Sequence, residues 1–160
     1  MKSIVSIFLS IVLLSFVALA NLAQGADDPI RAEPRGMTLR LELFVSDLEK
    51  SIDFYTSVLG FERLKGGPTY VPVRSGQVVI GLGPAKGLPK QHHFNPQVQT
   101  DRRGLGTEIV LEVDDVESFF KKVEATGYKR ILSPLRKQAW GLTDFRIIDP
   151  DGYYLRITSR

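Results

Sequence analysis

Charged side chains alternate with apolar ones in three short stretches, and these charges are the best candidates for chemistry. The stretches are RLELF (40–44), EIVLE (108–112) and YLR (154–156). An arginine guanidinium stays protonated and presents a fork of N–H donors that suits carboxylates and other anions. A glutamate beside it can form an ion pair or act as a general base. Arg40 and Arg156 therefore favour a ligand that carries anionic groups.

The alternation predicts β-strands, because successive side chains of a strand point to opposite faces. In the first stretch Leu41, Leu43 and Val45 would face a helix, which leaves Arg40, Glu42 and Phe44 on the other face. The same argument places Glu108, Val110 and Glu112 on one face of the second strand. Tyr154 and Arg156 share a face of the third strand if Leu155 and Ile157 belong to the core.

A helix is predicted directly after the first strand. Ser46 and Glu49 have the spacing of a capping box, in which a side chain accepts a hydrogen bond from the first turn. Apolar residues then recur at helical spacing up to Gly60, which can end a helix. The segment TYVPVRSGQVVIGLG (69–83) predicts a hairpin that turns near its Ser-Gly pair. The first unit is therefore a strand, a helix and about three more strands.

A second helix is predicted after the second strand. Asp114 and Glu117 supply the cap-like pair, an apolar stripe follows, and Gly127 ends it. We expect Phe119 and Phe120 to lie in the core.

The two units are copies of one pattern. When Val45 is placed on Val113, Asp47 falls on Asp115. The second copy also ends in a hairpin, LTDFRIIDPDGYYLRIT (142–158), which turns at its Asp-Pro-Asp-Gly sequence. Between the copies, residues 83–106 are rich in Pro, Gly and polar residues and predict a linker.

Residues 1–25 have the composition of a secretory signal peptide. Lys2 is followed by an apolar run from Ile4 to Ala20 and by small-residue cleavage patterns. We expect cleavage, a secreted or periplasmic protein and no stable membrane insertion after processing; a permanent membrane anchor is the alternative. Residues 26–37 would form a flexible segment before the domain.

The remaining composition narrows the classes of function. Of the 160 residues none is cysteine, which excludes thiol nucleophiles and thiolate metal sites. Without Lys2 the sequence contains 20 basic and 18 acidic side chains. This near-balance of charge gives no excess of basic residues that would indicate nucleic-acid binding. About 135 residues are enough for one domain with a sizeable core.

Three stretches of the sequence carry a resemblance to a known family: VSDLEKSIDFYTSVLGF (45–61), VDDVESFFKKVEATGY (113–128) and WGLTDFRIIDPDGYYLRI (140–157). They resemble the vicinal oxygen chelate superfamily, which includes glyoxalase I, extradiol dioxygenases and bleomycin resistance proteins. The resemblance covers residues 38–158. It implies an α+β fold of two βαβββ modules, 38–83 and 106–158, which form an open, cup-like curled sheet with helices outside.

The resemblance also locates the metal ligands of the superfamily's metal-dependent members. Their positions correspond to Arg40, Glu108, residues 79–81 and Arg156. Only Glu108 can ligate, because a guanidinium has no free lone pair and its charge opposes a dication. We therefore expect no metal and no cofactor, and an ion pair between Glu108 and Arg40 or Arg156. The ending resembles the metal-free, bleomycin-resistance-like branch.

The candidate ligand-binding residues follow from the strands and the resemblance: Arg40, Glu42, Phe44, Glu108, Glu112, Trp140, Tyr154 and Arg156. In this branch the Trp140-Gly pair lies at the mouth of the cleft, where an exposed indole can stack on a flat ligand or form a lid. His92 and His93 match no ligand position and are expected at the solvated surface of the linker.

Three functions remain open. The first is an exported protein that binds a small anionic or aromatic molecule in a metal-free cleft. The second is a metal-dependent lyase, isomerase or dioxygenase, and the third a metal-free enzyme with Glu108 or Glu112 as base. Whether a reaction is catalysed is not decided by the residues. A homodimer is expected, in which modules pair across two chains so that each cleft takes Arg40 from one chain and Arg156 from the other.

Overall fold

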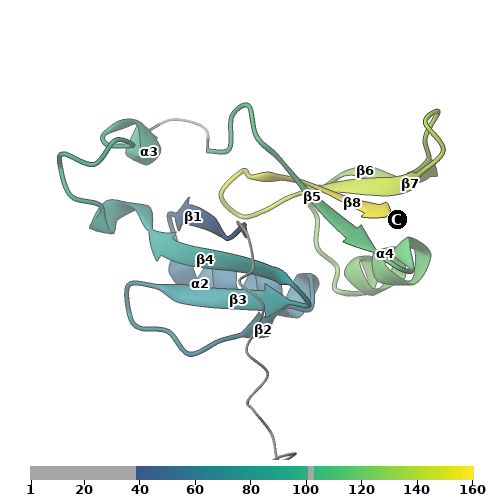
Figure 1. Cartoon of the computed structure of the whole chain (residues 1–160), viewed down its shortest axis with the longest axis horizontal. Helices are drawn as coiled ribbons and strands as arrows, with labels where there is room; N and C mark the ends of the chain where they lie inside the picture. The colour runs from purple at the N-terminus through teal and green to yellow at the C-terminus, as the bar shows by residue number, and fades with distance from the viewer. Residues whose placement is uncertain (1–38, 101–102) are drawn as a thin grey trace, which may run out of the picture. The chain divides into compact units, whose positions relative to one another are not determined.

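The computed structural model describes residues 39–100 and 103–160, shown in colour in Figure 1. The expected signal peptide (1–25) and the segment 26–37 lie outside the described residues. Within the described part, no helix is both long and apolar enough to cross a membrane.

Module 1 is a four-stranded sheet with a helix on one face. Its elements are β1 (Leu41–Val45), α2 (Leu48–Asp53), the π-helical turn η1 (Phe54–Val58), β2 (Glu62–Arg63), β3 (Val71–Ser75) and β4 (Val78–Pro84). The strands lie in the order β1-β4-β3-β2, with β1 parallel to β4 and the other pairs antiparallel. The edge strand β1 is therefore bonded to the sheet on one side only.

Module 2 repeats this arrangement. Its elements are β5 (Glu108–Val113), α4 (Val116–Ala125), β6 (Ile131–Lys137), β7 (Thr143–Ile148) and β8 (Tyr154–Ser159). The order β5-β8-β7-β6 matches that of module 1, again with one parallel pair, β5 with β8. The predicted α+β fold of two βαβββ modules with open sheets is confirmed, as are both predicted hairpins.

The hydrophobic core lies on the apolar side of each sheet. Leu43 and Val45 of β1 are buried, as are Leu155 and Ile157 of β8, so the predicted sidedness of these strands is confirmed. In module 2 the stripe of α4 packs on this side, where Phe120 contacts Phe145 with ring centroids 4.9 Å apart. The opposite face of each sheet carries the charged residues.

The predicted helix caps are each displaced by one residue. Asp47, not Ser46, caps α2 and accepts a hydrogen bond from the Lys50 N–H at 3.1 Å. Asp115, not Asp114, caps α4 and accepts from the Ser118 N–H at 2.9 Å. The Asp side chain reaches the N3 N–H from the residue next to the helix, so the true caps are the two aspartates that the repeat aligned.

The first helix continues as a π-helical turn, which the sequence did not indicate. In η1 the Leu59 N–H bonds the carbonyl of Phe54, five residues earlier, at 3.1 Å. The wider turn buries two consecutive aromatic rings, Phe54 and Tyr55. Phe54 packs on Tyr128 of module 2, with ring centroids 4.9 Å apart, so this turn joins the modules.

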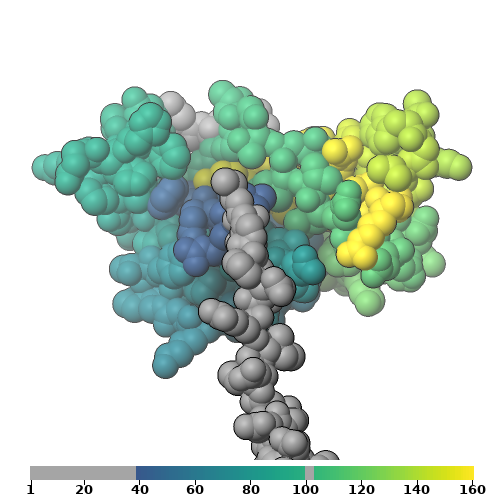
Figure 2. All heavy atoms as spheres, in the orientation of Figure 1, coloured from purple at the N-terminus to yellow at the C-terminus, as the bar shows by residue number. Residues whose placement is uncertain are grey.

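The linker has structure of its own. It contains the short helices η2 (Ala85–Gly87) and α3 (Gln97–Thr100) and lies beside β1, as the space-filling view shows (Figure 2). The Gln99 side-chain amide donates to the Ala85 carbonyl at 2.7 Å and ties the two short helices together.

Candidate functional site

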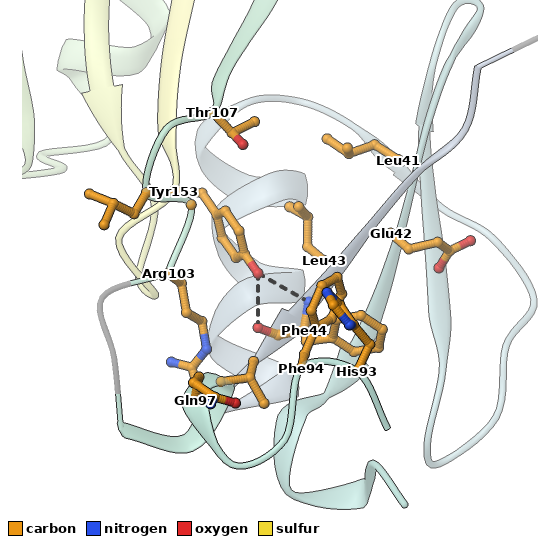
Figure 3. A pocket seen from close by; sticks show the side chains of 13 residues that line it. Leu41, Glu42, Leu43, Phe44, His93, Phe94, Gln97, Arg103, Thr107 and Tyr153 are labelled. Carbon is orange, nitrogen blue, oxygen red and sulfur yellow. Dashed lines mark hydrogen bonds between the residues drawn. The ribbon is translucent and has the colours of Figure 1, made fainter. Parts of the chain in front are cut away.

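A cavity of about 620 Å³ opens beside β1 (Figure 3). Its walls come from β1, from the linker and from the β7–β8 turn of module 2. Residues that can contact a ligand through rings or polar groups include Glu42, Phe44, His93, Phe94, Gln97, Arg103, Thr107 and Tyr153. The predicted Glu42 and Phe44 thus line this cavity, together with several residues that the sequence did not indicate.

Aromatic rings form one side of this cavity. Phe44 makes edge contacts with Phe94 at 5.6 Å and with His92 at 5.5 Å between ring centroids. His93 contacts Phe94 in the same way at 5.3 Å. His92 is half-buried because its ring packs on Phe44, whereas His93 is exposed, as expected for the linker.

Tyr153 and Arg103 form the opposite side. The Tyr153 hydroxyl points at the backbone of Phe44, and the dashed lines in Figure 3 mark both hydrogen bonds between them. Burial raises the pKa of Tyr153, so its hydroxyl stays protonated at neutral pH. The Arg103 guanidinium donates to Asp151 at 2.7 Å and to the Ser46 hydroxyl at 2.9 Å. These contacts hold its cationic group in place at the cavity.

Glu42, which lines the cavity, also pairs with Arg40 on the charged face of module 1. Arg40 Nε lies 2.7 Å from Glu42 Oε1, and the same oxygen accepts a hydrogen bond from Tyr70 at 3.0 Å. Burial and this hydrogen bond raise the pKa of Tyr70. Gly81 faces Glu42 across the sheet, and a Cβ at Gly81 would collide with the Glu42 carboxylate and the Tyr70 hydroxyl. The missing side chain of Gly81 therefore makes room for this cluster.

Four other predicted residues lie on the open face of the module 2 sheet: Glu108, Glu112, Tyr154 and Arg156. They follow β5 and β8, where Glu108 pairs with Tyr154 across the strands and Glu112 with Thr158. Glu108 Oε1 lies 3.3 Å from Arg156 Nε, so the predicted ion pair between Glu108 and an arginine is confirmed. None of the four lines the cavity beside β1.

Sequence reasoning missed Arg146 and Asp144 on the same face. Arg146 pairs directly with Arg156 across β7 and β8. Asp144 is fully buried and accepts from the Gln138 side chain at 2.7 Å. The alternation of TDFRII (143–148) carries the signal, since Phe145 and Ile147 are core residues and the residues between them must face the other way.

Trp140 lies in the turn between β6 and β7, and 56% of its surface is exposed. It does not line the cavity beside β1. The indole is free to contact a ligand or a partner from this turn.

The residues at the superfamily's metal positions do not fit a metal ion. Arg40 and Arg156 offer no lone pair, the space at Gly81 holds the carboxylate of Glu42, and Glu108 lies against Arg156. Among the described residues, no three His, Asp or Glu side chains gather as metal ligands would. We therefore derive no chemistry through a metal at these positions.

Paired βαβββ modules with open, charged sheet faces define the class of this chain. The sequence-family model described as Glyoxalase/Bleomycin resistance protein/Dioxygenase superfamily matches residues 38–157 of this chain. The chain therefore belongs to this superfamily.

Relatives in the superfamily have different functions. The bleomycin resistance protein of Geobacillus stearothermophilus is 29% identical over 112 residues, which cover 67% of this chain and 84% of that protein. The lactoylglutathione lyase of Escherichia coli O157:H7 is 32% identical over 128 residues, covering 74% and 89%. A crystal structure of a glyoxalase/bleomycin resistance protein/dioxygenase from Nocardioides superposes with a TM-score of 0.64 at 20% identity, over 88% of this chain and 92% of that one. This last likeness shows the fold alone.

Proposed function

We propose that this chain binds a small, flat organic molecule in the cavity beside β1, without a metal. The observation that carries the proposal is the cavity itself. Its volume of about 620 Å³ lies within the range of about 300–1,000 Å³ that is typical of ligand pockets. Phe94 is 46% exposed, so part of its surface can contact a ligand.

The charge of the site favours an anionic or aromatic ligand. Arg103 of the linker lines the cavity, and Arg40 of module 1 lies beside Glu42, which also lines it. A carboxylate or similar group on the ligand would find a guanidinium donor there. A metal-dependent reaction is not proposed, because the residues at the superfamily's metal positions do not fit a metal ion.

Binding of the anionic aromatic dye 1-anilinonaphthalene-8-sulfonate, followed by fluorescence, tests the proposal. Loss of one stacking ring costs about 0.5–1.5 kcal/mol, so Phe94→Ala should weaken binding by a factor of about 2 to 13. Leu132→Ala is the matched control, since Leu132 is an exposed apolar residue of module 2 outside the cavity. Equal affinities of wild type and Phe94→Ala would contradict the proposal. Native mass spectrometry of the purified protein would then search for the natural ligand.

We also propose that two chains form a homodimer in which module 1 of one chain faces module 2 of the other. In the described residues the two sheets form no strand pair with each other. The 24 residues from 83 to 106 are long enough for such an exchange. Sedimentation at micromolar concentration tests this, and a mass near one chain at all concentrations would leave a closed monomer as the better account.

Export is the third part of the proposal. The composition of residues 1–25 supports a cleaved signal peptide and a secreted or periplasmic protein. Fractionation of an expressing bacterium and N-terminal sequencing of the protein test this. Full-length protein that begins at Met1 in the membrane fraction would favour an anchor instead.

A further inference from the structure

Two arginines lie side by side on the open face of the module 2 sheet. Arg146 on β7 and Arg156 on β8 are direct cross-strand partners, so both side chains leave the sheet from adjacent positions on the same face. Both strands are interior to the sheet, and the side chains are only 19% and 22% exposed. Like charges in this relation repel each other, which makes the pair costly unless an anion lies between them.

The neighbouring carboxylates only partly neutralise the pair. Arg146 Nη2 lies 3.5 Å from Asp144 Oδ2, well beyond the 2.7–2.9 Å or so that is typical of a strong charge-assisted bond. The other oxygen of Asp144 accepts from Gln138. Asp144 is fully buried, so it holds Arg146 in position and cannot move out to enclose it.

The contact of Arg156 is weak in the same way. Its Nε lies 3.3 Å from Glu108 Oε1 without the geometry of a hydrogen bond. The buried Nε atoms of both arginines have no hydrogen-bond partner among the described residues. Glu108 is 39% exposed and can turn toward solvent when another anion approaches. The two guanidinium groups thus keep donors that the described protein does not use.

The surroundings would accept the rest of a small molecule. Val110 of β5 pairs with Arg156, so Val110, Arg156 and Arg146 form one row across three strands. Val110 is an exposed apolar residue at the end of this row. A molecule with an oxyanion at one end could place its apolar part on Val110.

We propose that Arg146 and Arg156 together form a binding site for an oxyanion, the carboxylate or phosphate group of a small molecule. Each fork of N–H donors matches two oxygens of such a group, and an anion between the forks removes the repulsion of the pair. The site goes beyond the function proposed above, because neither arginine lines the cavity beside β1.

Calorimetric titration of the full chain tests the site. Inorganic phosphate and malonate are titrated separately, at constant ionic strength set with chloride. Arg146→Gln and Arg156→Gln should each weaken binding at least tenfold. The matched control is Arg74→Gln on β3, whose guanidinium bonds the exposed Glu62 at 3.1 Å, and its affinity should stay within twofold of wild type.

The lysine variants keep the test decisive if a glutamine variant does not fold. Arg146→Lys and Arg156→Lys retain the charge but lose the planar fork, so malonate should bind several-fold more weakly to each. Binding of malonate alone or phosphate alone by the wild type identifies the class of oxyanion. No binding of either anion by the wild type, or equal losses in Arg74→Gln, would overturn the site. These results are independent of dye binding by Phe94→Ala, so the two proposals can fail separately.

Discussion

The hydroxyl of Tyr153 bonds both backbone groups of Phe44. It accepts the Phe44 N–H at 3.3 Å and donates to the Phe44 carbonyl at 3.2 Å. Phe44 lies on the edge strand β1, and Tyr153 comes from the β7–β8 turn of the other module. A side chain of module 2 therefore forms the hydrogen bonds that a neighbouring strand would form near the C-terminal end of β1. It fixes the wall of the cavity at the same point.

Tyr153→Phe should destabilise the protein by about 1 kcal/mol, since it removes a hydroxyl that serves two half-buried backbone groups. Urea unfolding gives the free energy. Tyr154→Phe is the adjacent control: no hydrogen bond of its hydroxyl is found in the described residues, and its cost should stay below about 0.5 kcal/mol. Equal costs for the two variants would contradict the role of the Tyr153 hydroxyl.

Asp151→Ala should destabilise the protein by about 3 kcal/mol, because it leaves the buried charge of Arg103 without a partner. The side chains of this pair are only 2% and 13% exposed, and Asp151 also accepts from Ser46 and Ser51. Thermal and urea unfolding measure the loss.

The control for Asp151 is Asp114→Ala. The ion pair of Asp114 with Arg160 is exposed at both ends, so its loss should cost under about 1 kcal/mol. A cost for Asp151→Ala as small as that of the control would show that the network around Arg103 contributes little.

Stability should depend on pH through Asp149. Burial raises the pKa of this carboxyl from 3.8 to about 6, although three backbone N–H groups bond its Oδ1. Tyr55 and Asp151 also face it, and Arg130 bonds its carbonyl oxygen. The folded state thus binds the proton more tightly than the unfolded state. The protonated Asp149 therefore contributes to stability in full below pH 4, and this contribution is lost as the pH rises to about 6. The free energy of unfolding falls by at most about 3 kcal/mol over this range.

Asp149→Asn isolates this effect, because an amide keeps the oxygen that accepts the three N–H groups and carries no charge. The difference in unfolding free energy between the variant and the wild type should therefore favour the variant more at pH 7 than at pH 4. Denaturant titrations across that range measure it. A difference that does not vary with pH would be evidence against a raised pKa of Asp149.

The corrected cap of α4 gives a fourth prediction. Asp115→Ala should lower the free energy of unfolding, because it removes the acceptor for the Ser118 N–H. Asp114→Ala, one residue earlier, should cost less than Asp115→Ala. The hydrogen bond to Ser118 lowers the pKa of Asp115, so this contribution is lost as the pH falls below about 4. If Asp114→Ala costs more stability than Asp115→Ala, Asp114 is the cap, as the sequence pattern indicated.

Chelators should not change the stability of the domain, because the residues at the superfamily's metal positions do not form a metal site. The melting temperature with EDTA should equal that with added zinc, nickel or manganese. A melting temperature that rises with one metal, and no longer rises in Glu108→Gln, would show a site in which Glu108 is a ligand.

The fold could be predicted from the sequence because its signals are local and occur twice. Period-two alternation located β1, β5 and β8 and assigned their faces, and Asp-Pro-Asp-Gly located the last turn. The predicted cap positions were wrong by one residue. Adjacent polar residues, such as Ser46 and Asp47, can each cap the helix in a pattern that fits the sequence about equally well. Only the path of the backbone selects between them.

Only some of the residues around the cavity could be predicted from the sequence. Arg40, Glu42 and Phe44 follow from strand alternation, but the cavity depends on contacts between residues far apart in the sequence. Tyr153 is 109 positions from Phe44, and Arg103 comes from a linker without periodicity. No local pattern indicates such contacts, so His93, Phe94 and Arg103 could be found only in three dimensions.

The π-helical turn at Phe54–Val58 makes the first helix sensitive to chain length. A π turn contains about one residue more than an α turn, and this extra residue lets Phe54 and Tyr55 both face inward. Deleting one residue here would permit a regular α-helix but would rotate everything after it by about 100° around the axis. Leu59 and Phe61 would then leave the core. Evolution can exchange side chains in this turn more readily than it can shorten it.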